Sequence, residues 1–344
     1  MTVHVGIVGQ GYWGPNLLRN YVDLPGASVE WVCDTNQVAL EKVHKRHSSV
    51  AVTTDYEVVL GDDRVQAVVL ATPISTHFEL AKQALQAGKH VFIEKPMATS
   101  VAECEELNAL ADAAGLTLMI GHTFVYSPPV RKIGELLDSG EIGEVRFVTS
   151  SRVNLGLHQK DVSVVWDLAC HDLSILSYWL GEAADTVNGV GRACIQPDIP
   201  DVAFLNLTFP SGCVASIDVS WLSPVKLRRT VLVGSRKMLL YDDTESVEKV
   251  KIYDHGVDFR DPETFGEFQL SYRTGDILAP KLDSTEPLFA EASHFVECIE
   301  TGRRPITDGV AGLQVVAALE AADRAVREGG CQTVAVPEAC KRRA

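Results

Sequence analysis

Three glycines near the start of the chain have the spacing of a phosphate-binding turn. They belong to Gly9-Gln10-Gly11-Tyr12-Trp13-Gly14, which follows a short apolar run and precedes a helical stretch. In such a turn the first glycine permits tight bending, the second lets a pyrophosphate approach the backbone, and the third lets helix and strand pack closely. The helix N-terminus then offers N–H donors to the anion. The segment predicts a dinucleotide site formed by these glycines with Tyr12 and Trp13.

An acidic residue at the end of the next apolar run agrees with this prediction. Asp34 comes 20 residues after Gly14, where a carboxylate can accept both ribose hydroxyls of an adenosine. The alternative is an ordinary helix N-cap. Because a carboxylate repels a 2′-phosphate and residues 35–39 contain no Arg or Lys, the sequence favours NAD over NADP as the cofactor.

A lysine stands at the end of a further predicted strand, in the triplet Glu94-Lys95-Pro96. In doubly wound sheets, ligands bind beyond the carboxyl ends of the strands. An ammonium group there can hydrogen-bond a substrate hydroxyl and favour its alkoxide character as hydride leaves. The alternative is a solvated surface lysine, which a position between an apolar strand and a proline disfavours.

Asp167 and His171 form the third candidate group, within the segment Trp166-Asp167-Leu168-Ala169-Cys170-His171-Asp172. Four residues apart on a helix, they share one face. A helix N-terminus favours neutral imidazole, which suits His171 as a general base. Asp167 would either favour the imidazolium form, contact the substrate or orient the base. The alternative is a surface helix start with Asp167 as N-cap. We expect no metal site here, because adjacent residues point in different directions around a helix.

These segments closely resemble the Gfo/Idh/MocA family, which includes glucose–fructose oxidoreductase and inositol dehydrogenase. The most specific pieces are Gly88-Lys89-His90-Val91 and Glu94-Lys95-Pro96, and the resemblance extends to about residue 330. It implies that Lys95, Asp167 and His171 are catalytic and contact the substrate, and that the Lys95–Pro96 bond is cis. It also implies additional cofactor contacts, from Thr72, Pro73, His77, Glu94, Lys95 and His122.

The Gly-Tyr-Trp-Gly and Gly-His-Thr strings, with Arg152-Val153-Asn154, are similar to the bacterial nucleotide-sugar 3-dehydrogenase branch. That branch includes UDP-N-acetylglucosaminuronate 3-dehydrogenases and enzymes of aminosugar antibiotic pathways. The resemblance implies NAD-dependent oxidation at C3 of a nucleotide-linked hexose, with an aminotransferase acting next on the keto sugar. Arg152 and Asn154 become candidate sugar or phosphate contacts, or else an edge-strand surface.

Two other functions remain open. One is the reverse enzyme, a ketoreductase of a deoxysugar or aminoglycoside pathway. The other is a dinucleotide-binding regulator without turnover, which the joint presence of Lys95, Asp167 and His171 disfavours. Homodimers or homotetramers are expected by analogy with the family.

The elements that must position these residues fall into two groups. Strand and helix signals alternate over residues 1–121, which predicts a doubly wound Rossmann domain with a parallel sheet. Residues 122–330 predict an α+β domain on a largely antiparallel sheet, with two late helices at 287–300 and 310–329 packing back on the body. Residues 254–284 show no clear element, and residues 331–344 form a tail.

Composition limits the possible partners. A net charge of −15 over 344 residues argues against nucleic acid, which requires clustered cations. No apolar run is long enough for a membrane span, and the first residues lack the pattern of a signal peptide. The 8 cysteines form no C-x-x-C pair and read as reduced thiols. We therefore expect a cytoplasmic protein with a small-molecule substrate.

Overall fold

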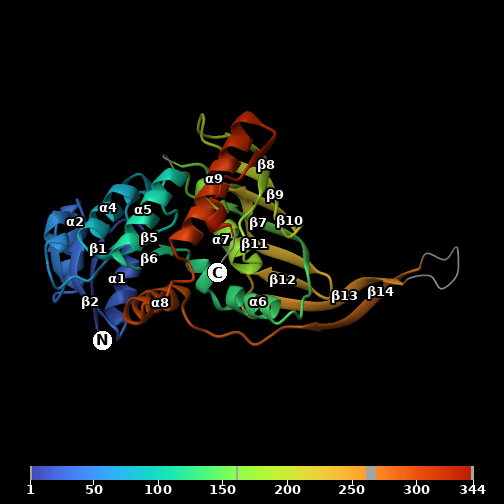
Figure 1. Ribbon diagram of the computed structural model, residues 1–344, viewed down its shortest axis with the longest axis horizontal. Helices are drawn as coiled ribbons and strands as arrows, with labels where there is room; N and C mark the ends of the chain where they lie inside the picture. The colour runs from blue at the N-terminus through green and yellow to red at the C-terminus, as the bar shows by residue number, and fades with distance from the viewer. Residues whose placement is uncertain (1, 160–161, 261–268, 342–344) are drawn as a thin grey trace. The chain divides into compact units, whose positions relative to one another are not determined.

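The computed structural model describes residues 2–159, 162–260 and 269–341 (Figure 1). The chain forms two compact units: Met1–Ser127 with Thr285–Ala317, and Pro128–Ser284 with Ala318–Ala344. This division differs from the expected boundaries at residues 121 and 330. The first unit takes up a late segment of the chain, because the helix that begins at Pro287 packs against it.

The first unit contains a six-stranded parallel sheet, which confirms the expected Rossmann fold. The strand order is β3-β2-β1-β4-β5-β6. Short runs of Val, Ile and Leu, buried on both faces, account for most of these strands. Their bounds are β1 Val3–Val8, β2 Ala27–Cys33, β3 Ala51–Thr53, β4 Ala67–Leu70, β5 His90–Glu94 and β6 Leu118–Gly121.

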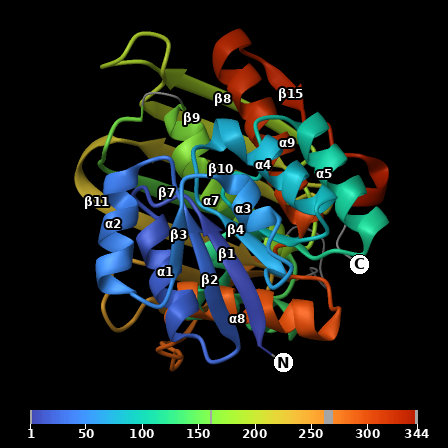
Figure 2. The ribbon, with the colours of Figure 1, turned by 90° about the vertical axis from the view of Figure 1, so that its left-hand side faces the viewer.

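Helices cover both faces of this sheet. Figure 2 shows α1 and α2 on one side of the strands and α4 and α5 on the other. Side-chain caps fix several helix starts, as where Asn36 accepts from Val38 N at 3.0 Å. The bounds are α1 Gly14–Asp23, α2 Gln37–Arg46, α3 Tyr56–Leu60, α4 Ile74–Gln86, α5 Val101–Ala114, η1 Thr123–Tyr126, α8 Pro287–Thr301 and the first part of α9, Gly309–Glu328.

The second unit is built on a nine-stranded sheet in the order β14-β13-β12-β11-β7-β10-β9-β8-β15. Within the described part of this sheet, β7 and β10 pair in parallel and the other strand pairs are antiparallel, so the expectation of a largely antiparallel sheet is confirmed. The bounds are β7 Val145–Leu155, β8 Thr186–Arg192, β9 Val202–Thr208, β10 Val214–Ser220, β11 Leu222–Gly234, β12 Met238–Asp242, β13 Val250–Arg260, β14 Gln269–Leu278 and β15 Cys331–Thr333.

Two parts of this sheet differ from the sequence-based expectation. Strands β13 and β14 form a long hairpin in the region that showed no clear element (Figure 1). Within the expected tail, β15 pairs with β8 at the edge of the sheet. The turn Pro210-Ser211-Gly212 joins β9 to β10, with Gly212 at φ +88°.

Alternating burial along β9 shows which face of the sheet is covered. Ala203, Leu205 and Leu207 are buried, whereas Phe204 and Asn206 are exposed. The helices of this unit are α6 Pro128–Asp138, a π-helical turn η2 at Val165–Ala169, α7 Cys170–Leu180, the remainder of α9 and the short η3 Glu338–Cys340. Across the described ranges, no helix combines the length and apolar character needed to cross a bilayer.

Candidate active site

The glycine turn after β1 has the geometry that the motif predicts. Gly9 has φ +96°, and a Cβ there would lie 2.4 Å from Ala71 O. A Cβ on Gly14 would lie 2.1 Å from Gly9 O, so this glycine allows helix α1 to approach the turn. A Cβ on Gly11 would meet no atom within 4 Å. The turn is therefore closed on the protein side and open at Gly11, which fits a pyrophosphate approaching the backbone.

Asp34 lies at the end of β2 beside this turn. Its carboxylate accepts from Gln10 N at 2.5 Å and from Asn36 N at 2.7 Å. These backbone donors hold the side chain half-exposed at the carboxyl end of the sheet, where an adenosine ribose of NAD fits. Asn36, rather than Asp34, caps helix α2. The N-cap alternative for Asp34 is therefore wrong.

The two aromatic residues of the turn are accessible. Tyr12 is 87% exposed and Trp13 is 37% exposed. Their rings stack at a centroid distance of 6.5 Å. Both aromatic surfaces are accessible next to the glycine turn, and their contact with a bound cofactor stays a prediction.

His77 ties together the two loops that follow β4 and β5. Its Nδ1 lies 2.8 Å from Pro96 O and its Nε2 lies 2.9 Å from Thr72 O. The ring is only 1% exposed, and burial lowers the pKa of His77 although both carbonyls oppose this. His77 therefore holds the two loops together from the interior. This corrects the expectation that His77 itself contacts the cofactor. Thr72 and Pro73 lie in the β4 loop that it supports, and the Lys95–Pro96 bond is cis.

Lys95 comes directly after β5 and is half-buried, at the carboxyl edge of the sheet where Gly9 and Asp34 also lie. The preceding Glu94 is buried, and its Oε2 accepts from Lys95 N at 3.2 Å. Burial raises the pKa of Glu94 to about 7, which the Lys95 ammonium partly opposes. Lys95 is therefore the direct neighbour of a carboxyl group whose pKa lies at about 7.

Glu291 on α8 is a second buried carboxyl group of this unit, and sequence reasoning missed it. It is 0% exposed and accepts from Thr123 Oγ1 at 2.8 Å. Burial, and then the charge of Glu94, raise the pKa of Glu291 well above its usual range. No motif marks this residue, because it lies 197 positions after Glu94 and reaches the site only through the packing of α8. His122 is also buried, at 1% exposure, so its side chain belongs to the interior here rather than to an open surface.

In the second unit, Asp167 and His171 lie at the start of α7. Asp167 is in the π-helical turn Val165–Ala169, and His171 follows in the first turn of α7. Both side chains are half-buried. Trp221, just after β10, donates from Nε1 to Asp167 Oδ2 at 3.0 Å. A π-turn is often found at functional sites, and this one was not visible in the helical spacing.

The environment of Arg152 does not fit the role expected for it, that of a sugar or phosphate contact. Its side chain is 5% exposed and forms an ion pair with Asp172, with Nε 2.7 Å from Oδ2. Burial alone would lower the pKa of Arg152, but Asp172 holds it above its usual value. Asn154, two residues along β7, is half-buried and stays a candidate contact.

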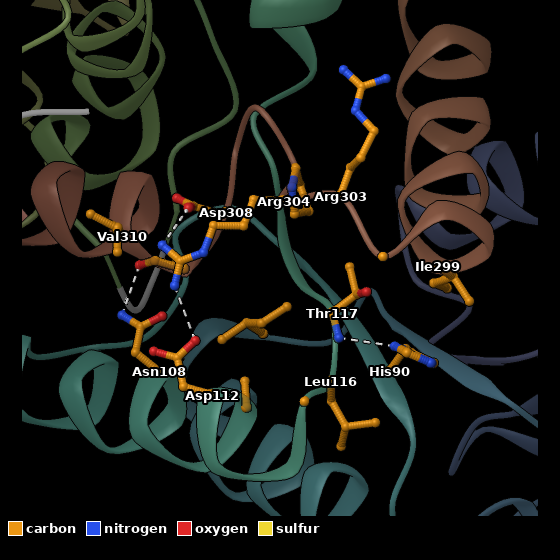
Figure 3. A pocket seen from close by; sticks show the side chains of 16 residues that line it. His90, Asn108, Asp112, Leu116, Thr117, Ile299, Arg303, Arg304, Asp308 and Val310 are labelled. Atoms are coloured by element: carbon orange, nitrogen blue, oxygen red, sulfur yellow. Dashed lines mark hydrogen bonds and ion pairs between the residues drawn. The ribbon is translucent and has the colours of Figure 1, made fainter. Parts of the chain in front are cut away.

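Other features of the structure do not extend the site. No group of three His, Cys, Asp or Glu in the described part of the chain could hold a metal ion. A pocket of about 280 Å³ lies at the amino ends of β5 and β6 (Figure 3). Lys95 follows the other, carboxyl end of β5. At the pocket, Arg304 pairs with Asp112 at 3.1 Å and with Asp308 at 3.7 Å. These bonds tie the segment between α8 and α9 to α5.

Two family models match the chain. One is the oxidoreductase family with an NAD-binding Rossmann fold, over residues 3–122, and the other is the GFO/IDH/MocA C-terminal domain, over residues 130–240. The chain belongs to the Gfo/Idh/MocA family of oxidoreductases. Its first unit is accordingly an NAD-binding domain, and the open glycine turn with Asp34 fits that cofactor.

Family members with assigned activities are similar over nearly the whole chain. UDP-N-acetylglucosamine 3-dehydrogenase from Acidithiobacillus ferrooxidans is 29% identical, over 92% of this chain and 95% of its own. A solved structure of that enzyme, GnnA, has a TM-score of 0.80 at 26% identity, covering 96% and 99% of the two chains. D-apiose dehydrogenase from Paraburkholderia graminis is 25% identical, over 94% and 87%. Two other curated relatives are matched over only 66% and 58% of their lengths.

Proposed function

We propose that this protein is an NAD-dependent sugar dehydrogenase that oxidises a ring secondary alcohol at C3 of a nucleotide-linked hexose. The observation that carries the proposal is the set Lys95, Asp167 and His171, each half-buried and placed at the end of a strand or the start of a helix. The similarity to UDP-N-acetylglucosamine 3-dehydrogenase over 92% of the chain supports the class of substrate.

Each of these residues has a role that its chemistry suits. Lys95 donates a hydrogen bond to the hydroxyl oxygen and stabilises the charge that develops on it. His171 takes the hydroxyl proton as general base. Asp167, held by Trp221, orients the imidazole. NAD, when bound, supplies the hydride acceptor.

Substrate binding falls to fewer residues than the sequence indicated. Asn154 stays a candidate sugar contact, together with Lys95, Asp167 and His171. Arg152 is not a candidate substrate contact, because its guanidinium forms a buried ion pair with Asp172. Binding energy from the nucleotide, remote from the reacting ring, would be used to orient that ring, so a nucleotide-linked sugar should be preferred over the free sugar.

We also propose a homodimer or homotetramer that pairs through the uncovered face of the nine-stranded sheet. Val190 and Phe204 are register partners on this face and are 64% and 53% exposed. Apolar side chains exposed side by side on a sheet are typical of an interface. Light scattering should give a mass of two or four chains, and Phe204→Lys should lower that mass.

The keto product would suit an aminotransferase as the next enzyme.

The test is a panel of nucleotide sugars, sugar 1-phosphates, free sugars and inositols, incubated with NAD and followed at the NADH absorbance band. We expect the highest kcat/KM for a nucleotide sugar, with a product two mass units lighter that reacts as a ketone. A free sugar or inositol with higher kcat/KM would refute the substrate class. Turnover only in the direction of keto-sugar reduction would identify the ketoreductase instead, and NAD binding without any turnover would indicate a regulator.

A further inference from the structure

A buried ion pair lies next to the proposed base in the second unit. Arg152 presents its guanidinium edge to Asp172, with Nε 2.7 Å from Oδ2 and Nη2 3.2 Å from Oδ1. The two side chains are 5% and 3% exposed. This two-pronged contact fixes the direction of the carboxylate as well as its position.

Hydroxyl groups from the sheet complete the environment of the carboxylate. Ser150 donates from Oγ to Asp172 Oδ1 at 2.8 Å. The Oγ1 of Thr230 is in turn hydrogen-bonded to Ser150 Oγ at 2.9 Å. Ser150 and Thr230 are register partners on β7 and β11. Asp172 is therefore anchored to two residues of β7, supported from the next strand, at the point where α7 begins.

Stability alone does not explain such a pair. Two well-packed apolar residues of similar size would often serve a protein interior equally well, because desolvating two charges offsets most of their attraction. A paired charge does supply a fixed orientation. Here the orientation concerns a helix start that follows a π-helical turn, where the usual hydrogen-bond pattern is interrupted.

We propose that Arg152 and Asp172 are positioning residues for His171. Successive residues on an α-helix are rotated by ~100°. With Asp172 bonded to β7, the direction in which the neighbouring His171 leaves the helix is fixed about 100° around the axis, and His171 is half-buried. The pair thereby sets the direction of the imidazole without touching the substrate. This inference rests on the proposed role of His171 as general base.

The test uses three variants of the pair and one control. Arg152→Lys keeps the charge but loses the planar fork, and Asp172→Asn keeps the size but loses the charge. The double variant Arg152→Met/Asp172→Leu keeps an apolar interior without an unpaired charge. The control is Arg229→Lys, because Arg229 pairs with Asp242 at 3.0 Å and is the register partner of Ser151, whose side chain alternates along β7 with those of Ser150 and Arg152. Thermal melting and circular dichroism select variants that fold.

With the best nucleotide sugar, we expect each pair variant to lower kcat on the order of 10- to 100-fold, as a misplacement of about 1 Å does. KM and the NAD dissociation constant should stay within about twofold of the wild-type values, because the variants disturb the orientation of His171 and not the binding of substrate or cofactor. Arg229→Lys should keep wild-type kcat. A folded double variant with wild-type kcat and pH profile would overturn the inference.

A second readout needs no substrate. The Cε1–H resonance of His171, identified by its loss in His171→Asn, should shift and titrate differently in Asp172→Asn and Arg152→Lys but not in Arg229→Lys. An unchanged resonance in folded variants would also overturn the inference. If His171→Asn itself keeps wild-type turnover, the proposed base is wrong. If His171→Asn is inactive while the pair variants are unaffected, only the positioning role fails.

Discussion

The indole N–H of Trp221 donates a hydrogen bond to Asp167 Oδ2 at a distance of 3.0 Å. Trp221 is buried and lies just after β10, whereas Asp167 lies in the π-helical turn before α7. One oxygen of the carboxylate is thus fixed from the sheet. This relationship favours an orienting role for Asp167 over a role as the base, because the indole holds the carboxylate in one position.

Replacing Trp221 tests that role. Trp221→Phe keeps the ring bulk and removes the donor, so Asp167 should become less ordered and kcat should fall by about tenfold, the value of one hydrogen bond to a charged group. Trp179→Phe is the matched control, because its indole donates to Val130 O at 2.9 Å within the same unit. It should lower the melting temperature but not kcat. Equal kcat in both variants would remove Trp221 from the site.

Loss of the proposed base should be seen in rate and pH dependence together. His171→Asn cannot accept the proton, so kcat should fall by ~10²–10⁴ while NAD affinity barely changes. The kcat/KM profile should also lose its rising limb at about pH 6–7, the range in which histidine titrates. The exposed His44 on α2 provides the control variant, His44→Asn. More than about a tenth of wild-type kcat in His171→Asn contradicts the assignment.

The cooperation of Lys95 and His171 can be measured with a double-mutant cycle. Lys95→Met should lower kcat, because a hydrogen bond to the developing alkoxide is lost. The double variant should lose less than the product of the two single effects if both residues act on one oxygen. Steady-state kinetics of the four proteins decide this. Strictly multiplicative effects would mean that the two residues act in separate steps.

Cofactor preference should depend on Asp34. We expect calorimetric titration to show tighter binding of NAD than of NADP, because the carboxylate repels a 2′-phosphate. Asp34→Ser/Thr35→Arg should narrow the preference, and the single variant Thr35→Arg controls for the added cation. Thr35 is the better site for it, since Asn36 caps α2. Equal or tighter NADP binding by the wild type would be incompatible with this role.

The buried carboxyl of Glu94 predicts a pH dependence of stability. Its pKa is raised from 4.5 to about 7, so between these values the folded protein holds a proton that the unfolded chain has released. This contribution therefore destabilises the fold as pH rises, by up to ~1.4 kcal/mol per pH unit for one group. Without cofactor, the melting temperature of Glu94→Gln relative to wild type should rise across this interval. The control is Glu79→Gln, at an exposed position on α4, whose melting temperature relative to wild type should not change with pH. If the difference for Glu94→Gln is also independent of pH, Glu94 does not titrate in this interval.

The Rossmann half was predictable because its information is local. The glycine turn and Asp34 lie within residues 9–34, and the turn geometry follows from where a Cβ would collide. The apolar runs follow one another along residues 3–121. Lys95 at the end of β5 follows from the same alternation of strands and helices. The short strand Ala51–Thr53 has too few residues to show a period. In β13 the apolar alternation is interrupted by Asp254-His255-Gly256.

Long-range packing determined what could not be predicted. Arg152 has the residue type of a phosphate contact, and only the fold reveals that Asp172 neutralises it. Glu291 reaches its place because α8 packs in the first unit, and no local sequence pattern predicts that packing. His77 has a suitable spacing for a cofactor contact, yet both ring nitrogens are directed at backbone carbonyls.

The first unit is assembled from two distant stretches of the chain, which affects how it can fold during synthesis. Phe295 of α8 packs edge-on against Phe92 of β5, with ring centroids 5.7 Å apart. The ribosome makes Phe295 only after the whole of Pro128–Ser284, so the six-stranded sheet lacks one of its covering layers while that segment is synthesised. Contacts of such long sequence separation form slowly. The nascent chain therefore carries an apolar surface around Phe92 during that interval, when partly folded chains are most prone to aggregate.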